Sequence, residues 1–284
     1  MSRRWIALAV ALAAGPASAQ APPRFQWKPG QALTYSVQQT TTVTETTIDD
    51  GTNKPVTAST ATKLALTRRW EVKAVDPDGT ATLELAITAM RQEIVRPGPP
   101  DKDGQPTADR TVIDSATAEG RQQTAAFLNK PILTARVDAR GRLVEAKAAN
   151  GPTDRLQAEL PFRLTLPEQM PQVGGVWDRA FAIQLDPPLG TGEKYDATQT
   201  YTLKGESQGH LVVGVRTALK AAPKDPAELP ALVPLLWEGD VYFHKETGRY
   251  SGARLSVKKE VPNHQGEGTK FVYESQLTEG LAEK

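Results

Sequence analysis

Histidine is the side chain that most often ligates metals or moves protons near neutral pH, and this chain contains three. They are His210, His244 and His264, and none has a second histidine close to it in the sequence. A zinc site needs three or four converging ligands, usually at short fixed spacings. His244 alternates with Phe243 and lies on the strand face opposite Val241, so we expect it to face solvent. We therefore expect surface histidines and no metal site.

Serine and glycine patterns indicate structural roles. The chain contains no Gly-x-Ser-x-Gly nucleophile elbow. Asp114-Ser115 follows the strand-like Thr111-Val112-Ile113 and precedes a candidate helix, which predicts an N-cap. Val173-Gly174-Gly175-Val176 predicts a turn before a strand, whereas a phosphate loop joins a strand to a helix. Neither nucleophilic catalysis nor nucleotide binding is indicated.

Acidic residues offer two further chemistries. Asp76–Gly79 and Asp101–Gly104 contain acidic, glycine-ended turns, but they lack the alternating oxygen ligands and distal glutamate of a calcium loop. A carboxylate pair for glycoside hydrolysis needs only spatial closeness and stays open. Strand-like or apolar contexts around three tryptophans favour core packing over sugar stacking: Trp70, Trp177 and Trp237. We predict no catalytic, cofactor-binding or metal-binding residue, and hence a protein that is not an enzyme.

The N-terminus is typical of a signal peptide. Arg3 and Arg4 form a basic region, an apolar stretch runs from Trp5 to Ala14, and Ala17-Ser18-Ala19 follows a Gly-Pro breaker. The apolar stretch is shorter than the roughly 20 residues of a membrane span. We expect cleavage between Ala19 and Gln20 and export to the periplasm or the extracellular space. The paired arginines leave twin-arginine export open beside the general secretory route, which we favour.

Composition narrows the partners. The chain has no cysteine, so we expect neither a disulfide nor a lipid anchor at the cleavage site, and no further apolar run predicts a membrane span. The formal net charge is +1, from 34 basic and 33 acidic side chains. Removing Arg3 and Arg4 leaves 32 basic side chains against 33 acidic ones, a net charge of −1. This balance argues against nucleic acid as a partner.

Alternating apolar and polar residues predict long strands. Leu33, Tyr35 and Val37 share one strand face, and the threonine-rich 40–47 extends that strand to a solvated end. A second strand places its even-numbered residues from 64 to 74 on one face, interrupted by Arg68. Other strands are expected over 81–87, 134–148 (folded about Arg140-Gly141), 177–185, 201–204, 211–219, 241–244, 250–259 and 271–277.

Helix signals are few. The best candidate is Thr117–Asn129, which Pro131 stops. Shorter candidates are Thr153–Leu160, capped by Thr153 or Asp154, and Ala227–Leu236, which two prolines interrupt. Proline, glycine and aspartate in 96–110 predict a mobile loop.

These elements predict a mainly β fold, with one large curved antiparallel sheet, open and half-barrel-like, and a few short covering helices. We expect one β-rich domain over 20–284. Similar hairpins after Trp70 and Tyr201 leave open two pseudo-repeated halves, about 20–150 and 151–284.

Five diffuse motifs carry a resemblance: Trp27-Lys28-x-Gly30, Trp70-Glu-Val-Lys-Ala-Val-Asp76 with Gly79, Asp114-Ser115, Val173-Gly-Gly-Val-Trp177 and Tyr201-Thr-Leu-Lys-Gly205. Spread over most of the mature chain, they resemble a family of β-rich secreted proteins from planctomycete-type bacteria that has no established activity. The resemblance therefore implies no site residues. The expected fold is also similar to that of bacterial envelope carriers of lipids and lipoproteins, many of which have an anchoring cysteine that this chain lacks.

Our leading hypothesis is a non-catalytic envelope protein that binds a hydrophobic ligand, such as a lipid or acyl chain, or an envelope protein in a sheet-lined groove. A second hypothesis is an interaction module that assembles through strand edges, with 40–47 as the open edge. A third is a hydrolase with an acidic site.

Overall fold

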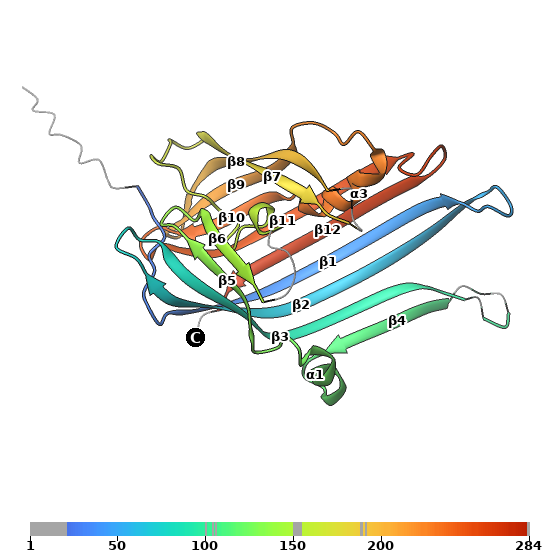
Figure 1. Ribbon diagram of the computed structural model, residues 1–284, viewed down its shortest axis with the longest axis horizontal. Coiled ribbons are helices and arrows are strands. Elements are labelled where there is room, and N and C mark those ends of the chain that lie inside the picture. The colour runs from blue at the N-terminus through green and yellow to red at the C-terminus, as the bar shows by residue number, and fades with distance from the viewer. Residues whose placement is uncertain are drawn as a thin grey trace, which may run out of the picture.

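Long antiparallel strands dominate the computed structural model, which describes residues 22–99, 101–103, 105, 107–149, 155–187, 190 and 192–282 (Figure 1). The predicted signal peptide lies outside the described residues. The strands are β1 (Ala32–Ile48), β2 (Pro55–Val75), β3 (Ala81–Gly98), β4 (Thr107–Asp114), β5 (Pro131–Val137), β6 (Leu143–Ala148), β7 (Val176–Leu185), β8 (Glu193–Ser207), β9 (His210–Leu219), β10 (Glu238–His244), β11 (Arg249–Pro262) and β12 (Lys270–Leu281).

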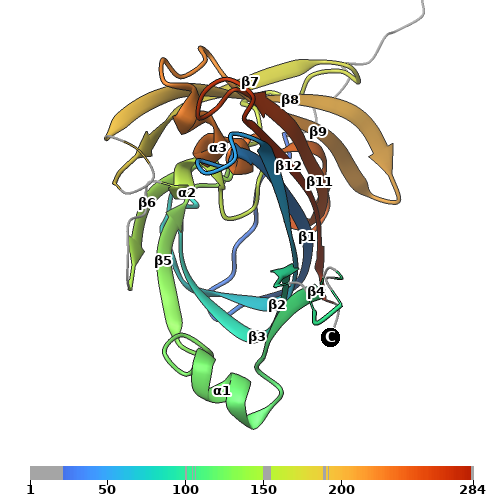
Figure 2. The same ribbon diagram turned by 90° about the vertical axis from the view of Figure 1, so that its right-hand side faces the viewer.

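All these strands belong to one sheet, in the order β6-β5-β3-β2-β1-β12-β11-β10-β9-β8-β7, with β4 also paired to β3. The pairing of β1 with β12 joins the two ends of the described chain. Figure 2 shows the sheet curving from β5 through β3, β2 and β1 to β12 around a concave side. The predicted fold class, a large curved antiparallel sheet with few short helices, is confirmed. The duplication stays a prediction.

Side chains alternate between the concave, inner face and the outer face. Leu33, Tyr35 and Val37 are buried on the inner face, as predicted. On β2 the even-numbered residues keep that face as far as Val72. A bulge follows Val72 and turns Ala74 outward, so placing Ala74 on the inner face was wrong. One extra residue in a strand shifts every later side chain to the other face.

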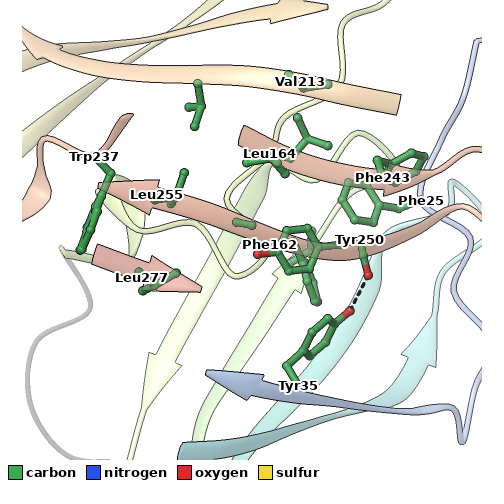
Figure 3. Packing of buried hydrophobic residues seen from close by; sticks show 14 of the residues in the cluster. Phe25, Tyr35, Phe162, Leu164, Val213, Trp237, Phe243, Tyr250, Leu255 and Leu277 are labelled. Atoms are coloured by element: carbon green, nitrogen blue, oxygen red, sulfur yellow. Dashed lines mark hydrogen bonds between the residues drawn. The ribbon is translucent and has the colours of Figure 1, made fainter. Parts of the chain in front are cut away.

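Chain segments without strand structure fill part of the concave side. Phe25 and Trp27 enter from the N-terminal side, and the segment 160–167 enters between β6 and β7 in the sequence. The ring of Phe162 lies among those of Trp27, Trp70 and Tyr250, with centroid distances of 5.2, 5.6 and 5.9 Å. Figure 3 shows Phe162 beside Tyr250. This aromatic core closes one end of the concave side.

The helices are short. They are α1 (Ala118–Thr124), α2 (Arg155–Ala158) and α3 (Leu229–Leu232), the last flanked by the 3₁₀ turns η1 (Pro226–Glu228) and η2 (Val233–Leu235). The predicted helix Thr117–Asn129 is therefore too long, since turns replace it after Thr124. The proposed caps Thr153 and Asp154 lie outside the described residues.

The N-cap prediction at Asp114-Ser115 was wrong. Thr117 caps α1, and its hydroxyl accepts a hydrogen bond from the Gly120 amide at 3.0 Å. The Ser115 hydroxyl instead accepts from the Met90 amide on β3 at 2.9 Å. The Asp114 carboxylate binds Arg91 at 2.6 Å. These residues hold the turn after β4 against β3.

Two predictions about loops and edges also fail. The predicted mobile loop 96–110 contains the end of β3 and the start of β4, which pair from Arg91 with Asp114 to Gly98 with Thr107. The threonine-rich 40–47 is not an edge, because β1 pairs with β12 on one side and β2 on the other throughout this stretch except at Thr47, which pairs only with β2. The predicted turns at Asp76–Gly79 and Val173–Gly174 are present, whereas Gly104 lies outside the described residues.

Candidate functional site

Beyond the aromatic core, the inner faces of β1, β2 and β3 carry apolar side chains that are only half-buried. Leu66 pairs with Met90 on β3, and Leu64 is two residues further along β2 on the same face. Ile94 continues this face on β3, and Val43 continues it on β1. All five side chains are half-buried. We call Val43, Leu64, Leu66, Met90 and Ile94 the open inner face.

The helices and 3₁₀ turns pack on strands other than β1, β2 and β3. α1 packs on β4 and α2 on β7, while η2 packs on β11 and β12. Accordingly Val257 on β11, with Tyr273 and Leu277 on β12, is buried. The two sides of the concave face therefore differ. The 3₁₀ turn η2 packs on β11 and β12, whereas the open inner face stays half-buried.

A polar seam separates these two sides. The Gln39 amide donates to the Ser275 hydroxyl at 3.1 Å, and Thr41 and Ser275 share a hydrogen bond of 2.8 Å. Ser275 is buried, and its hydroxyl also reaches the Thr40 carbonyl at 3.1 Å. These polar groups hydrogen-bond to one another. An apolar ligand beside the seam would therefore leave few of them without a hydrogen-bond partner.

A buried ion cluster lies where the open inner face meets the aromatic core. Glu279 of β12 has a fully buried side chain and forms an ion pair with Arg68 of β2. The Tyr250 hydroxyl donates to Glu279 Oε2 at 2.8 Å, and Arg163 Nε lies 3.8 Å from the same oxygen. The Tyr35 hydroxyl donates to the Tyr250 carbonyl at 3.0 Å. The carboxylate of β12 is thus held by groups from three other segments: β2, β11 and 160–167.

The cluster fixes the protonation of its members. Burial raises the pKa of Tyr250 well above its ordinary value, and the Glu279 charge raises it further. Burial opposes the charge of Arg68, but Glu279 outweighs this effect and raises the pKa of Arg68. Arg68 therefore stays charged and Tyr250 stays neutral at physiological pH. The lone arginine that interrupts the apolar face of β2 was the sequence signal for this cluster.

His244 lies on the face opposite Val241 and Phe243, as predicted, whereas the prediction for His264 was wrong. His210 and His244 are cross-strand partners on β9 and β10, and their rings meet edge to face at 4.8 Å. They line an outer-face cavity of about 690 Å³ together with Arg249. His264 was predicted to lie at the surface, but it is buried. Its Nε2 lies 3.1 Å from Glu45 Oε1. No group of three or more potential ligands that could hold a metal ion occurs among the described residues.

Two carboxylates meet at one buried phenol on β8, next to the edge strand β7. The Tyr195 hydroxyl contacts Glu193 at 3.4 Å and makes a shorter hydrogen bond to Glu228, which is buried. Burial, followed by Glu228, raises the pKa of Tyr195. Sequence reasoning missed this pair of carboxylates, because Glu193 belongs to β8 and Glu228 to η1. The hydrolase hypothesis stays a prediction.

The tryptophans contribute to packing. Trp70 and Trp237 are buried, and Trp177 stacks on Tyr201 with a centroid distance of 5.5 Å while its indole N–H donates to the Thr165 carbonyl. No helix within the described ranges is long and apolar enough to cross a membrane. The core role predicted for the tryptophans is confirmed.

Comparisons with known proteins identify no family. No protein-family model matches the chain, and no curated protein matches it. A solved structure described as "lipid-protein interactions in lipovitellin" is similar with a TM-score of 0.47 and 13% identity, over 91% of this chain and 26% of that chain. This chain thus spans about a quarter of the length of that protein, and a likeness so distant does not indicate what this chain binds. The resemblance to the planctomycete-type family stays a prediction.

Proposed function

We propose that this protein is a non-catalytic binding protein that holds an apolar ligand on the open inner face. One observation carries the proposal: five apolar side chains from three neighbouring strands are half-exposed on the concave side, whereas the helices pack on other strands. Apolar residues on concave surfaces are where small ligands bind, because the ligand removes them from water.

Adjacent residues of β3 offer a matched test. Ile94 faces inward and Val95 faces outward, and both are half-buried. Each apolar side chain covered by ligand contributes about 1–2 kcal/mol. Replacing both Leu66 and Ile94 by glutamine should weaken binding of a fluorescent fatty acid by about tenfold or more, and Val95→Gln should leave it unchanged. Equal effects of the two changes, or no uptake by the unmodified protein, would reject the proposal.

A second candidate function is assembly through strand edges. β4, β6 and β7 each carry a strongly exposed valine: Val112 at 42%, Val144 at 55% and Val176 at 57%. Exposed apolar residues on an edge strand favour pairing with another chain. Sedimentation at high concentration tests this idea. An oligomer that Val176→Lys dissociates would support it, and a monomer at every concentration would exclude it.

We also propose that the chain is exported with cleavage before Gln20, on the strength of the basic, apolar and Ala-Ser-Ala regions of the N-terminus. N-terminal sequencing of the protein released from cells tests the cleavage site. Replacing Arg3 and Arg4 by lysine distinguishes the two routes: export by the general secretory route should persist, and twin-arginine export should stop. A retained Met1 in the mature protein would contradict the proposal.

A further inference from the structure

Two guanidinium groups lie at the end of the open inner face that meets the aromatic core. Arg68 lies two residues after Leu66 on the inner face of β2, one side-chain step closer to the aromatic core. Arg163 comes from the segment 160–167, and its guanidinium carbon lies 6.0 Å from the centroid of the Trp237 ring. Both arginines contact Glu279. The cluster therefore borders the apolar surface on one side and the aromatic core on the other.

The charges in this cluster do not cancel. Arg68 and Arg163 carry two positive charges, and Glu279 supplies one negative charge between them. Arg68 has the closer contact, since Arg163 Nε is 3.8 Å from the carboxylate. A buried guanidinium without full compensation costs several kcal/mol. The arrangement thus leaves a positive charge that an additional anion would stabilise.

Arg163 has an ion-pair partner in Glu279 but no hydrogen bond at its Nε. Its side chain is only 13% exposed, and within the described part of the chain the buried Nε has no hydrogen-bond partner. Its backbone adopts a φ of 51°, a left-handed conformation that is costly for a residue with a β-carbon. Strained, under-satisfied groups that the surrounding structure holds in place are typical of ligand sites.

We propose that Arg163, backed by Arg68, binds an oxyanion headgroup of an amphipathic ligand whose apolar chain lies over the open inner face. This inference rests on the proposed function and specifies its ligand class. The planar guanidinium matches a carboxylate or a phosphate, which it can bind through two parallel hydrogen bonds. From Leu66 the face continues along β2 to the level of Val43, opposite Thr60, roughly 20 Å at 3.3 Å per residue.

The primary experiment needs no variant. Binding of anthroyloxy-stearic acid and of its methyl ester to the full chain is compared by fluorescence. Because a hydrogen-bonded ion pair contributes about 1.5–3 kcal/mol, the acid should bind about 10- to 100-fold more tightly than the ester. Arg163→Met should reduce the affinity for the acid by a similar factor and leave the ester unchanged. Arg254→Met, on the exposed outer face of β11, is the matched control.

Displacement of the probe identifies the oxyanion. Oleate represents carboxylates, lysophosphatidic acid represents phosphates, and monoacylglycerol is the uncharged reference. Displacement by either anion at concentrations far below those needed for monoacylglycerol supports the inference and names the headgroup. Equal affinity for acid and ester, or equal loss of both in Arg163→Met, overturns the headgroup inference while the proposed function stands. Failure of both probes to bind rejects the proposed function itself.

Discussion

The hydroxyl of Tyr250 donates to Glu279 Oε2 across 2.8 Å, between two side chains that are almost fully buried. Tyr250 belongs to β11 and Glu279 to β12, and Arg68 reaches the same carboxylate from β2. The Glu279 carboxylate therefore links β2 with β12 through Arg68, and its hydrogen bond from Tyr250 joins it to the aromatic core. Several predictions about the stability and the binding of the molecule depend on it.

Replacing Glu279 by glutamine should destabilise the fold strongly. The change removes the carboxylate and leaves Arg68 and Arg163 buried without a counter-charge. We expect a loss of about 3–5 kcal/mol in the free energy of unfolding. Urea unfolding followed by circular dichroism measures the effect. Glu274→Gln on the same strand is the control, because Glu274 pairs with Lys258 on the exposed face and should cost less than about 1 kcal/mol. Equal losses in the two variants would contradict this view of the cluster.

Alkaline pH should destabilise the protein through its buried tyrosines. Burial raises the pKa of Tyr35, Tyr201 and Tyr250. A raised folded-state pKa contributes stability that is complete below the unfolded-state pKa of about 10 and is lost as pH rises above it. The urea midpoint should therefore fall above that pH, and Tyr250→Phe should make the fall shallower. Tyr242→Phe is the control, and an unchanged slope in Tyr250→Phe would contradict the assignment.

The fold class follows from local alternation, and the site does not. Leu33, Tyr35 and Val37 repeat every second residue, so one strand and its buried face can be read without knowing its neighbours. The position of the threonine-rich 40–47 inside the sheet depends on β12, more than 200 residues away in the chain. Local composition carries no information about such pairing, and the predicted edge was therefore wrong.

Long-range register also decides the polar contacts. His210 and His244 meet only because β9 pairs with β10 in one register. The predicted loop 96–110 shows the same effect, since pairing along β3 and β4 overrides a composition rich in proline, glycine and aspartate. Arg68 was visible as an anomaly on an apolar face, but its partner Glu279 could not be identified without the sheet order. Arg163 has no periodic context at all.

Truncating Phe162 should be among the most destabilising changes in the core. Its ring is 1% exposed and touches rings from several separate segments, among them Trp70 and Tyr250. Phe162→Ala removes these contacts and leaves a cavity, with an expected loss of about 3–5 kcal/mol. Phe181→Ala is the control, because Phe181 is half-exposed beneath Arg179 and should cost less. Thermal unfolding compares the two, and similar losses would show that the aromatic core is not central.

Thr117 and Ser115 should respond differently to substitution. Thr117→Ala removes the cap of α1 and should cost about 1 kcal/mol, whereas Thr117→Asn should restore most of the loss because asparagine also caps helices. Ser115→Ala leaves the Met90 amide without its acceptor, and Ser115→Asn should not rescue that loss. Chemical denaturation measures both series. Rescue of both positions by asparagine would contradict the separate roles.

The cross-strand glycines Gly252 and Gly280 offer the sharpest comparison in the sheet, because they face each other on β11 and β12 and differ in the space beside them. Gly252 has a φ of 147°, and a β-carbon there would approach the Glu279 carbonyl oxygen to 2.1 Å. A β-carbon on Gly280 would meet no atom within 4 Å. Gly252→Ala must therefore shift the backbone that carries Glu279 and should cost about 2 kcal/mol or more, whereas Gly280→Ala should change the unfolding free energy by less than about 1 kcal/mol. Equal effects in urea unfolding would show that the close approach of β11 to Glu279 does not constrain the ion cluster.

If the headgroup inference holds, Gly252→Ala should also weaken binding of the acid probe more than Gly280→Ala does, since it displaces the carboxylate that positions Arg68 and Arg163.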